Sequence, residues 1–570
     1  MQTNEVMSRA FARFVLLFTA VFFAVFFFWP LIQILKGGFI NADGKLSFSA
    51  VYALLGEPLY LKAMLNSVLL ATTATVFAFI LGLPLAYIAE RFEFAGRKLF
   101  SSLVLVPLIL PAFVGAIGIR QLLGQAGALN SLIVALHLAP HGWSFDYLGS
   151  NRFIGVALVD ALSLYPLIML NAAASLAQID PSSEEAAENL GCTGFRRFFK
   201  ITLPLIKSGL FAGGTLVFIW AFTDLGTPLV FDYFNVTPVQ IYQGLSDLGS
   251  NPYPYALVAI MLTACLILYS LGKGVFGNSR GVISSKSSAR YTRKTLSPLK
   301  AAGCTALFLS VTLLAILPHL CVVLIAFSKD WYGSLLPSQF TTGNISAALS
   351  HNLAVSSIAN SLKYASVSTF IDLCLGVSIA YVIVRSKISG RKFLDLISIL
   401  PLAVPGLVLA FGYLVMAREG SFFSALNPVR NPTLLLIIAY SIRRLPYVIR
   451  TAVSGFEQTS ETLEEAAQNL GTPPLQVMLK ITLPLISANL IAGAILAFSF
   501  AMLEVSDSLI LAQKQTFYPI TKAIMELFQL LGDGKYIASA LGSWAMLVIS
   551  LAIIAVSVVL GKKLSSVLKS

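Results

Sequence analysis

Twelve apolar runs recur along this chain of 570 residues, and their length limits the fold more than any other feature. A helix needs about 20 apolar residues to cross the hydrocarbon core of a membrane. Hydrophobic residues make up 57% of the sequence and charged residues 11%, whereas soluble domains carry about 25% charged residues. The sequence therefore predicts an all-α, polytopic membrane protein of about twelve transmembrane helices.

The runs fall into two sets of six, one in each half of the chain. The spans predicted for the first half are 14–36, 65–89, 99–122, 153–178, 207–231 and 255–276. Those predicted for the second half are 302–327, 361–384, 394–416, 432–456, 486–512 and 538–560.

One charged stretch is written twice, once in each half. Glu184 to Leu205 reads EEAAENLGCTGFRRFFKITLPL, and Glu464 to Leu485 reads EEAAQNLGTPPLQVMLKITLPL. Other pairs, such as Asn66-Ser67 with Asn360-Ser361, recur at a spacing of 294 residues. The repeat predicts two homologous six-helix units, 1–272 and 301–570, joined by a linker at 273–300 that holds seven basic residues and no acidic one. Parallel repeats of this kind are common in transporters.

The basic residues set the expected orientation. Both copies of the repeated stretch, the linker and the two loops that contain Gly-Arg-Lys carry Lys or Arg, whereas the loop 232–254 carries neither. Cytoplasmic loops are enriched in these residues. We therefore expect both termini and both repeated stretches in the cytoplasm. The net charge of +13 then reflects membrane topology and lipid contact and not nucleic-acid binding.

Each repeated stretch predicts a short surface helix, near 180–191 and near 460–471. Asp180-Pro181 and Ser460-Glu461 supply a capping side chain and a suitable first residue. A glycine follows as a C-terminal stop. The adjacent alanines predict a small-residue face for another protein, with a glutamate beside it. The candidate docking residues are Glu185, Ala186, Ala187 and Gly191, and Glu465, Ala466, Ala467 and Gly471.

The spacing EAA-x3-G-x9-I-x-LP, present in both copies, resembles the signature of bacterial ABC-importer permease subunits. The resemblance implies that each short helix is a coupling helix that docks one ABC ATPase subunit, so two copies of the ATPase are expected. It also implies a periplasmic or lipid-anchored solute-binding protein and a location in the bacterial inner membrane. Two permease units in one chain are similar to the ferric-iron permeases, and also to the thiamine and 2-aminoethylphosphonate permeases.

No Gly-x4-Gly-Lys-Ser/Thr phosphate loop occurs in the sequence. ATP and Mg are therefore expected in the partner ATPase, and the chain itself is expected to be no enzyme and to hold no cofactor. The sequence also suggests neither a catalytic triad nor a metal site.

Charged residues inside spans are costly and often mark a transport path. Arg443 and Arg444 lie near the middle of one predicted span, where the first half has Ser163 and Leu164 with Asp160 just before. Asp224 and Glu504 occupy matching places in the fifth spans. One interpretation is a polar path for an anionic or chelated solute. The other is an ion pair, for example of Asp160 with an arginine, that fixes packing.

The third span of each half contains two prolines four residues apart, Pro107 and Pro111 in one half and Pro401 and Pro405 in the other. Proline removes a helical hydrogen bond and bends the helix. A kink here suits a moving gate or a static bundle.

The sequence as a whole favours a permease that imports a small solute, with ferric iron as the preferred cargo on the resemblance alone. A 2-aminoethylphosphonate, thiamine or other small-solute importer is the alternative. A secondary transporter driven by an ion gradient is a more distant one, which would not need paired docking helices.

Overall fold

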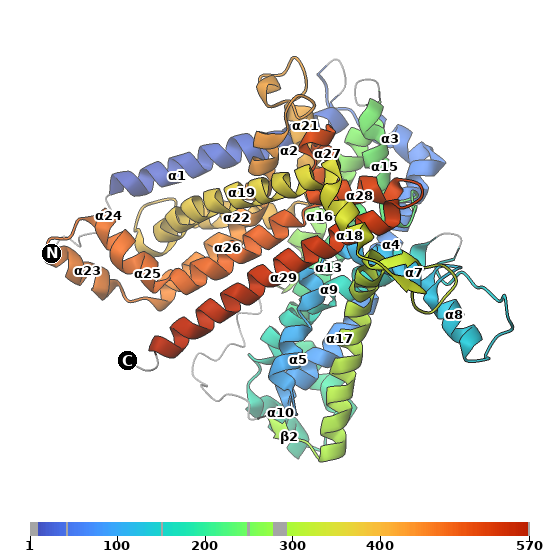
Figure 1. Cartoon of the computed structure of the whole chain (residues 1–570). Coiled ribbons are helices and arrows are strands. Elements are labelled where there is room, and N and C mark those ends of the chain that lie inside the picture. Colours follow the sequence, from blue (N-terminus) through green and yellow to red (C-terminus); the bar gives the residue numbers. More distant parts are fainter. Residues whose placement is uncertain (1–8, 41–43, 150–151, 248–250, 277–292, 568–570) are drawn as a thin grey trace. The chain divides into compact units, whose positions relative to one another are not determined.

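The computed structural model describes residues 9–40, 44–149, 152–247, 251–276 and 293–567, whose regular structure is almost entirely helical (Figure 1). The strands of the described residues form two small two-stranded sheets. β1 (Phe92–Glu93) pairs in parallel with β2 (Lys294–Thr295), and β3 (Ser328–Asp330) pairs antiparallel with β4 (Gln339–Phe340). The all-α, polytopic fold predicted from the sequence is confirmed.

The chain divides into two compact units, which are described separately. The N-half unit consists of Tyr52–Ser246 and Ile260–Ile345, and the C-half unit of Met1–Val51, Asp247–Ala259 and Ser346–Ser570. Four helices contain a boundary between units: α3 (Ser49–Gly56), η3 (Gly244–Asp247), α16 (Tyr253–Phe276) and α18 (Gly343–Ser350).

The N-half unit has α4, α9 and α13 packed together as its centre. Its helices are α4 (Pro58–Arg91), α5 (Arg97–Leu103), α6 (Val106–Ile109), α7 (Ala112–Leu123), α8 (Ala128–Ala135), α9 (Phe153–Leu176), α10 (Pro181–Asn189), α11 (Gly194–Arg197), the π-helix η2 (Phe198–Thr202), α12 (Leu203–Leu205), α13 (Lys207–Phe222), α14 (Gly226–Val230), α15 (Thr237–Gln243), the 3-10 helix η3 (Gly244–Asp247) and α17 (Pro298–Ala326).

The C-half unit repeats this plan with α19, α22 and α26 at its centre. Its helices are α1 (Arg9–Phe23), the π-helix η1 (Ala24–Phe28), α2 (Trp29–Phe39), α19 (Asn352–Arg385), α20 (Arg391–Ile399), the 3-10 helix η5 (Leu400–Ala403), α21 (Gly406–Met416), η6 (Ser424–Leu426), α22 (Thr433–Gln458), α23 (Glu461–Asn469), α24 (Pro474–Val477), the π-helix η7 (Met478–Thr482), α25 (Leu483–Leu485), α26 (Ser487–Met502), α27 (Ser506–Leu511), η8 (Gln515–Phe517), α28 (Ile520–Gln529) and α29 (Gly534–Val567).

Seven helices of the described residues are long and apolar enough to cross a membrane, and up to eleven spans result if each of four bent helix pairs counts as one. The predicted span outside this set is 432–456. Its helix, α22, is 26 residues long but carries Arg443, Arg444 and Arg450. It packs against α19 and α26, which explains how so polar a helix can belong to an apolar bundle.

The first helical run of each sequence half packs within the unit that holds most of the other half. α2 lies against α21, where the Tyr413 hydroxyl donates to the Phe26 carbonyl at 2.6 Å and Gly412 faces Pro30. α17 lies against α7, where Gly118 faces the Pro318 carbonyl. The compact units therefore group helices by packing, whereas the predicted units 1–272 and 301–570 group them by repeat and stay a prediction. Most of the predicted linker, 277–292, lies outside the described residues.

Candidate functional site

The repeated stretch of the N-half unit forms α10, and its two ends are set by local chemistry. The Asp180 carboxylate accepts from the Ser182 backbone N–H at 3.0 Å, and Pro181 occupies the first turn. At the other end Gly191 has φ +77°, and the backbone N–H groups of Gly191 and Cys192 donate to the carbonyls of Glu188 and Ala187. This pair of bonds is a Schellman cap, which favours glycine at the left-handed position.

α23 of the C-half unit is built in the same way. Ser460 accepts from the Thr462 backbone N–H at 3.3 Å. Gly471 has φ +86°, and the N–H groups of Gly471 and Thr472 donate to the carbonyls of Gln468 and Ala467. The two repeated stretches thus form two helices of 9 residues with the same caps.

A buried glutamate anchors α10 to its own bundle. Glu184 and Arg91 are each 1% exposed, and Arg91 Nη2 lies 3.0 Å from Glu184 Oε1. The Thr202 hydroxyl donates to the same oxygen at 2.8 Å. Arg91 is the last residue of the 34-residue helix α4, so the anchor lies at the end of this helix. A helix needs only about 20 residues to cross a membrane, and α4 is longer than that.

The equivalent anchor of α23 is Glu464, which is 0% exposed. Arg385, the last residue of α19, lies 3.4 Å from Glu464 and donates to the Thr459 carbonyl at 2.7 Å. Burial raises the pKa of Glu464, while Arg385 and a hydrogen bond from Thr482 act in the opposite direction.

The threonines of both anchors come from short π-helices. Thr202 ends η2 and Thr482 ends η7. A π-bulge inserts an extra residue into a helical turn and often occurs at functional sites. Each one precedes a sharp break in the chain, 74° before α13 and 77° before α26.

The residues predicted to dock a partner divide into two faces. Glu185 and Ala186 are exposed, as are Glu465 and Ala466, and so is each capping glycine. Ala187 and Ala467 are instead buried within their own units, at 7% and 9% exposure. Only one of the two adjacent alanines in each copy is therefore open to a partner.

Sequence reasoning missed the six residues that hold these helices in place. Each copy reads Glu-Glu, and it is the first glutamate that is buried. The signals were present, because the arginines are 294 residues apart and the threonines 280. The six residues are Arg91, Glu184, Thr202, Arg385, Glu464 and Thr482.

Large apolar side chains are exposed at and just after the C-terminal end of both helices. Leu190 and Leu470, the residues at the C-terminal caps, are each 88% exposed. Matching pairs follow in the next turns: Phe195 and Leu475 at 84% and 63% exposure, and Phe199 and Leu479 at 60% and 54%. Exposed apolar groups gathered in this way are typical of a protein interaction site.

The two helices differ at four positions, and at one of them the exposed Glu188 of α10 corresponds to the half-buried Gln468 of α23. Glu188 pairs with Arg197 at 2.7 Å and with Lys294 of β2 at 3.3 Å. The Lys294 ammonium and then Arg197 lower the pKa of Glu188. In the part of the chain that the structure describes, α10 is thus tied to the C-terminal part of the predicted linker.

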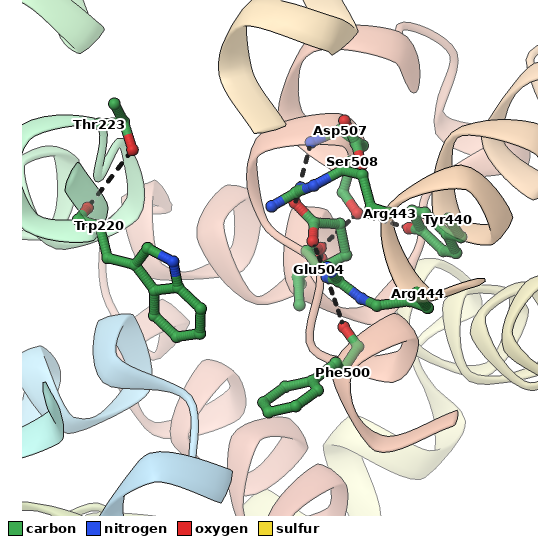
Figure 2. Close-up of polar contacts among 10 residues, drawn as sticks. Trp220, Thr223, Tyr440, Arg443, Arg444, Phe500, Glu504, Asp507 and Ser508 are labelled. Atoms are coloured by element: carbon green, nitrogen blue, oxygen red, sulfur yellow. Dashed lines mark hydrogen bonds and ion pairs between the residues drawn. The ribbon is translucent and has the colours of Figure 1, made fainter. Parts of the chain in front are cut away.

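A second polar group lies inside the C-half unit, between α22 and the start of α27 (Figure 2). Arg443 Nη1 lies 2.6 Å from Glu504 Oε1 and 3.2 Å from Asp507 Oδ2. Arg444 pairs with Glu504 and donates to the Phe500 carbonyl at 3.0 Å. Two guanidinium groups therefore face two carboxyl groups. We call these four residues the arginine cluster.

Three further bonds lie on or beside the arginine cluster. The Tyr440 and Ser508 hydroxyls lie 2.7 Å apart. The Thr521 hydroxyl donates to the Glu504 carbonyl at 2.7 Å, which adds α28 to the group. Ser441 bonds to Asp372 of α19.

The matching positions of the N-half unit hold different chemistry. Ser163 and Leu164 stand in place of the two arginines, and Asp224 and Thr227 stand in place of Glu504 and Asp507. Asp160 lies within hydrogen-bonding reach of Asp224 and Thr227. Among the described residues of this unit, neither carboxyl group has a Lys, Arg or His within 4.0 Å.

The prolines of the third spans lie at sharp bends. In the C-half unit, Pro401 is in η5 and Pro405 precedes α21, where the chain bends by 99°. In the N-half unit, Pro107 is in α6 and Pro111 precedes α7, with a bend of 93°. No group of three or more His, Cys, Asp or Glu suited to a metal occurs among the described residues.

Two repeated bundles of membrane-spanning helices, each with the same short helix held outside its bundle, define the class of transport permeases. The family described as binding-protein-dependent transport system inner membrane component matches residues 78–278 and 372–566, and the chain belongs to this family. The two matches confirm the prediction of two permease units fused in one chain. The chain is therefore a multi-pass protein of the inner membrane and a permease of an ABC importer.

Several proteins resemble this chain over most of its length. The ferric transport system permease protein FbpB of Actinobacillus pleuropneumoniae is 26% identical over 561 residues, which cover 94% of this chain and 76% of its own length. The putative ferric transport system permease protein FbpB 1 of Haemophilus influenzae is 26% identical over 519 residues, which cover 86% and 77%.

Other similarities cover one half. The putative 2-aminoethylphosphonate transport system permease protein PhnU of Salmonella typhimurium is 29% identical over 262 residues, which cover 45% of this chain and 88% of its own. A solved bacterial ABC transporter involved in the import of alginate covers 45% of this chain and 93% of its own, at 18% identity and a TM-score of 0.36. That score is too low to support an argument.

Proposed function

We propose that α10 and α23 are coupling helices, each of which docks one subunit of a separate ABC ATPase on the cytoplasmic side. The observation that carries the proposal is that two segments 280 residues apart have the same cap geometry, the same buried glutamate and the same exposed Glu-Ala pair. A surface that only connects two spans has no need for such agreement. A partner with two equivalent subunits does.

The two adjacent glutamates of each helix have different roles in this proposal. Glu184 and Glu464 tie each helix to the end of a long span, while Glu185 and Glu465 remain free for the partner. A displacement of the helix by the ATPase would then be passed to the span through a buried ion pair. In this proposal ATP and Mg are bound by the ATPase, this chain holds no cofactor, and both termini are cytoplasmic.

We further propose ferric iron as the cargo, delivered by a periplasmic or lipid-anchored binding protein. The similarity to two ferric permeases over most of the chain supports this cargo. A phosphonate is the alternative, because one relative is named for it. The sequence alone suggests that the arginines of the cluster could bind a phosphonate. In the structure they support this cargo less, because Arg443 and Arg444 are already paired with Glu504 and Asp507.

Co-purification tests the docking proposal. We expect an ATPase to co-purify with the wild-type chain and to be lost from the double variant Glu185→Lys/Glu465→Lys, in which both exposed acids are reversed. Glu57→Lys is the control, because Glu57 is exposed and lies at the opposite end of α4 from Arg91. Full retention of the ATPase by the double variant would overturn the proposal, and absence of any ATPase would favour a secondary transporter.

The cargo has its own test. The binding protein encoded with this permease should carry ferric iron when purified, and vesicles with the complete transporter should take up radioactive iron only with that protein and ATP. A binding protein loaded with a phosphonate or thiamine would replace the cargo and leave the docking proposal intact.

A further inference from the structure

The bend in the third span of the C-half unit has an arginine packed directly onto it. The chain turns by 99° between η5 and α21, and Gly406 is the first residue of α21. A Cβ atom placed on Gly406 would lie 2.0 Å from Nη1, 2.3 Å from Cζ and 2.7 Å from Nη2 of Arg443. The guanidinium group therefore lies against the glycine backbone. Any residue larger than glycine at position 406 would leave no room for it.

The other side of the same guanidinium is held by the fifth span. Glu504 and Asp507 lie 2.6 and 3.2 Å from Arg443 Nη1. Glu504 lies in the break between α26, which ends at Met502, and α27, which begins at Ser506, and Asp507 lies in the first turn of α27. Arg443 thus joins a bend in one span to a break in another.

The fifth span also continues from the repeated stretch. α23 is followed by α24, η7 and α25, and α26 begins two residues after α25 ends. Within this unit a continuous path runs from α23 through α26 to Glu504, then through Arg443 to Gly406. Coupling between distant sites needs such a chain of contacts between elements that can adopt two arrangements.

A comparison with the N-half unit indicates that the sizes of the side chains at positions 443 and 406 are matched to each other. At the positions of Arg443 and Gly406 it has Ser163 and Ala112. A large side chain with glycine stands in one unit where a small side chain with alanine stands in the other.

We infer that Arg443 is a positioning residue for transport: held by Glu504 and Asp507, it fixes the bend at Gly406 and connects it to the motion of α23. Arg443 is then occupied by the protein's own carboxyl groups and does not bind an anionic cargo. This inference rests on the proposed docking of an ATPase at α23.

The test uses the complete transporter in vesicles, with ATP hydrolysis stimulated by the binding protein and uptake of radioactive ferric iron as readouts. We expect Arg443→Ser and Gly406→Ala each to lower the maximal rate of both by about ten-fold, with an unchanged half-saturating concentration of binding protein. Arg443→Lys should recover part of the rate, because an ammonium keeps the charge but loses the planar fork. Gly303→Ala, which meets nothing within 4 Å, is the control and should behave as the wild type.

The double variant Arg443→Ser/Gly406→Ala decides the mechanism, because it recreates the Ser and Ala pair of the N-half unit. If Gly406 acts through Arg443, the double variant is no slower than Arg443→Ser alone. Rates that fall further in the double variant, a neutral Gly406→Ala, or an Arg443→Ser transporter with a normal maximal rate and a raised half-saturating concentration would each overturn the inference. Gly406→Ala decides alone if Arg443→Ser does not assemble.

The inference and the docking proposal fail separately. ATPase retention in every variant, with rates like the wild type, contradicts only the role of Arg443. Loss of the ATPase from the wild-type preparation contradicts the docking proposal itself.

Discussion

The short helices α10 and α23 differ less between the two halves than the buried polar positions inside the bundles do. α10 and α23 keep their caps, their anchoring glutamate and its arginine, although the sequences around them differ. Inside the bundles, a carboxyl pair at Asp160 and Asp224 stands where the other unit has the arginine cluster. What is shared lies on the helices proposed to bind a two-fold partner, and what differs lies among the polar residues inside the bundles.

This difference indicates which contacts are constrained from outside the chain. One kind of ATPase docked twice requires two equal surfaces. The buried polar positions inside each bundle are under no such requirement, so they are free to differ. The following predictions test how closely α10 and α23 agree in stability and in pH response.

Loss of an anchoring arginine should have the largest effect, and the effect should be larger in the first half. Arg91→Ala leaves Glu184 buried without its close cation, and removal of one partner of a buried ion pair costs about 3–5 kcal/mol. Arg385→Ala should cost less, because its contacts to Glu464 and Glu461 are 3.4 Å long and Glu461 is 56% exposed. The melting temperature of the purified complex measures both.

Arg430→Ala is the control for this pair. Arg430 and Glu419 are 73% and 75% exposed, and exposed pairs add little to stability. An Arg385→Ala variant that melts below Arg91→Ala would contradict the ranking.

The capping glycines should give equal, intermediate effects. Gly191→Ala and Gly471→Ala place a side chain at φ +77° and +86°, which costs about 1 kcal/mol. Chemical denaturation of each variant, compared with Gly303→Ala in the second turn of α17, measures this cost. Clearly unequal losses would argue against the shared cap geometry.

Acidification should separate the two helices. The pKa of Glu188 is lowered by Lys294 and Arg197, so its contribution to stability is present above its ordinary value of 4.5 and is lost as the pH falls through its folded pKa. The pKa of Glu464 is raised, chiefly by burial. Its contribution is therefore present below 4.5 and is lost as the pH rises through its folded pKa.

We expect hydrogen exchange, corrected for intrinsic rates, to speed up in α10 and not in α23 as the pH falls below 4.5. Glu188→Gln, which copies Gln468 of α23, should remove the acid response of α10. A wild-type protein in which both helices respond alike would contradict the assignment.

Lys294→Ala should have the smallest effect. The Lys294 side chain is 51% exposed and its contact with Glu188 is 3.3 Å, so exchange in α10 should rise by about two-fold or less, since exposed pairs are weak. Exchange in α23 should not change, which serves as the internal control. A rise of equal size in both helices would show that Lys294 acts on the whole protein.

The sequence predicts the spans and the short helices well, because apolar length and capping residues act locally. It does not predict which glutamate is buried, since neighbours on a helix lie about 100° apart and only the packed bundle decides between Glu184 and Glu185. The pairing of Arg443 with Glu504 joins residues 61 apart, so no local rule finds it. The sequence also does not predict that the first helical run of each half packs within the unit that holds most of the other half. Apolar runs look alike whatever they pack against.

Site-directed cross-linking gives the most direct test of the central claim, that both short helices hold an ATPase. Glu185→Cys and Glu465→Cys should each form a cross-link with the ATPase in the assembled transporter, because both positions are exposed. Ala187→Cys and Ala467→Cys, buried within their units, should form none. Cross-linking from only one of the two glutamate positions, or from neither, would contradict the account.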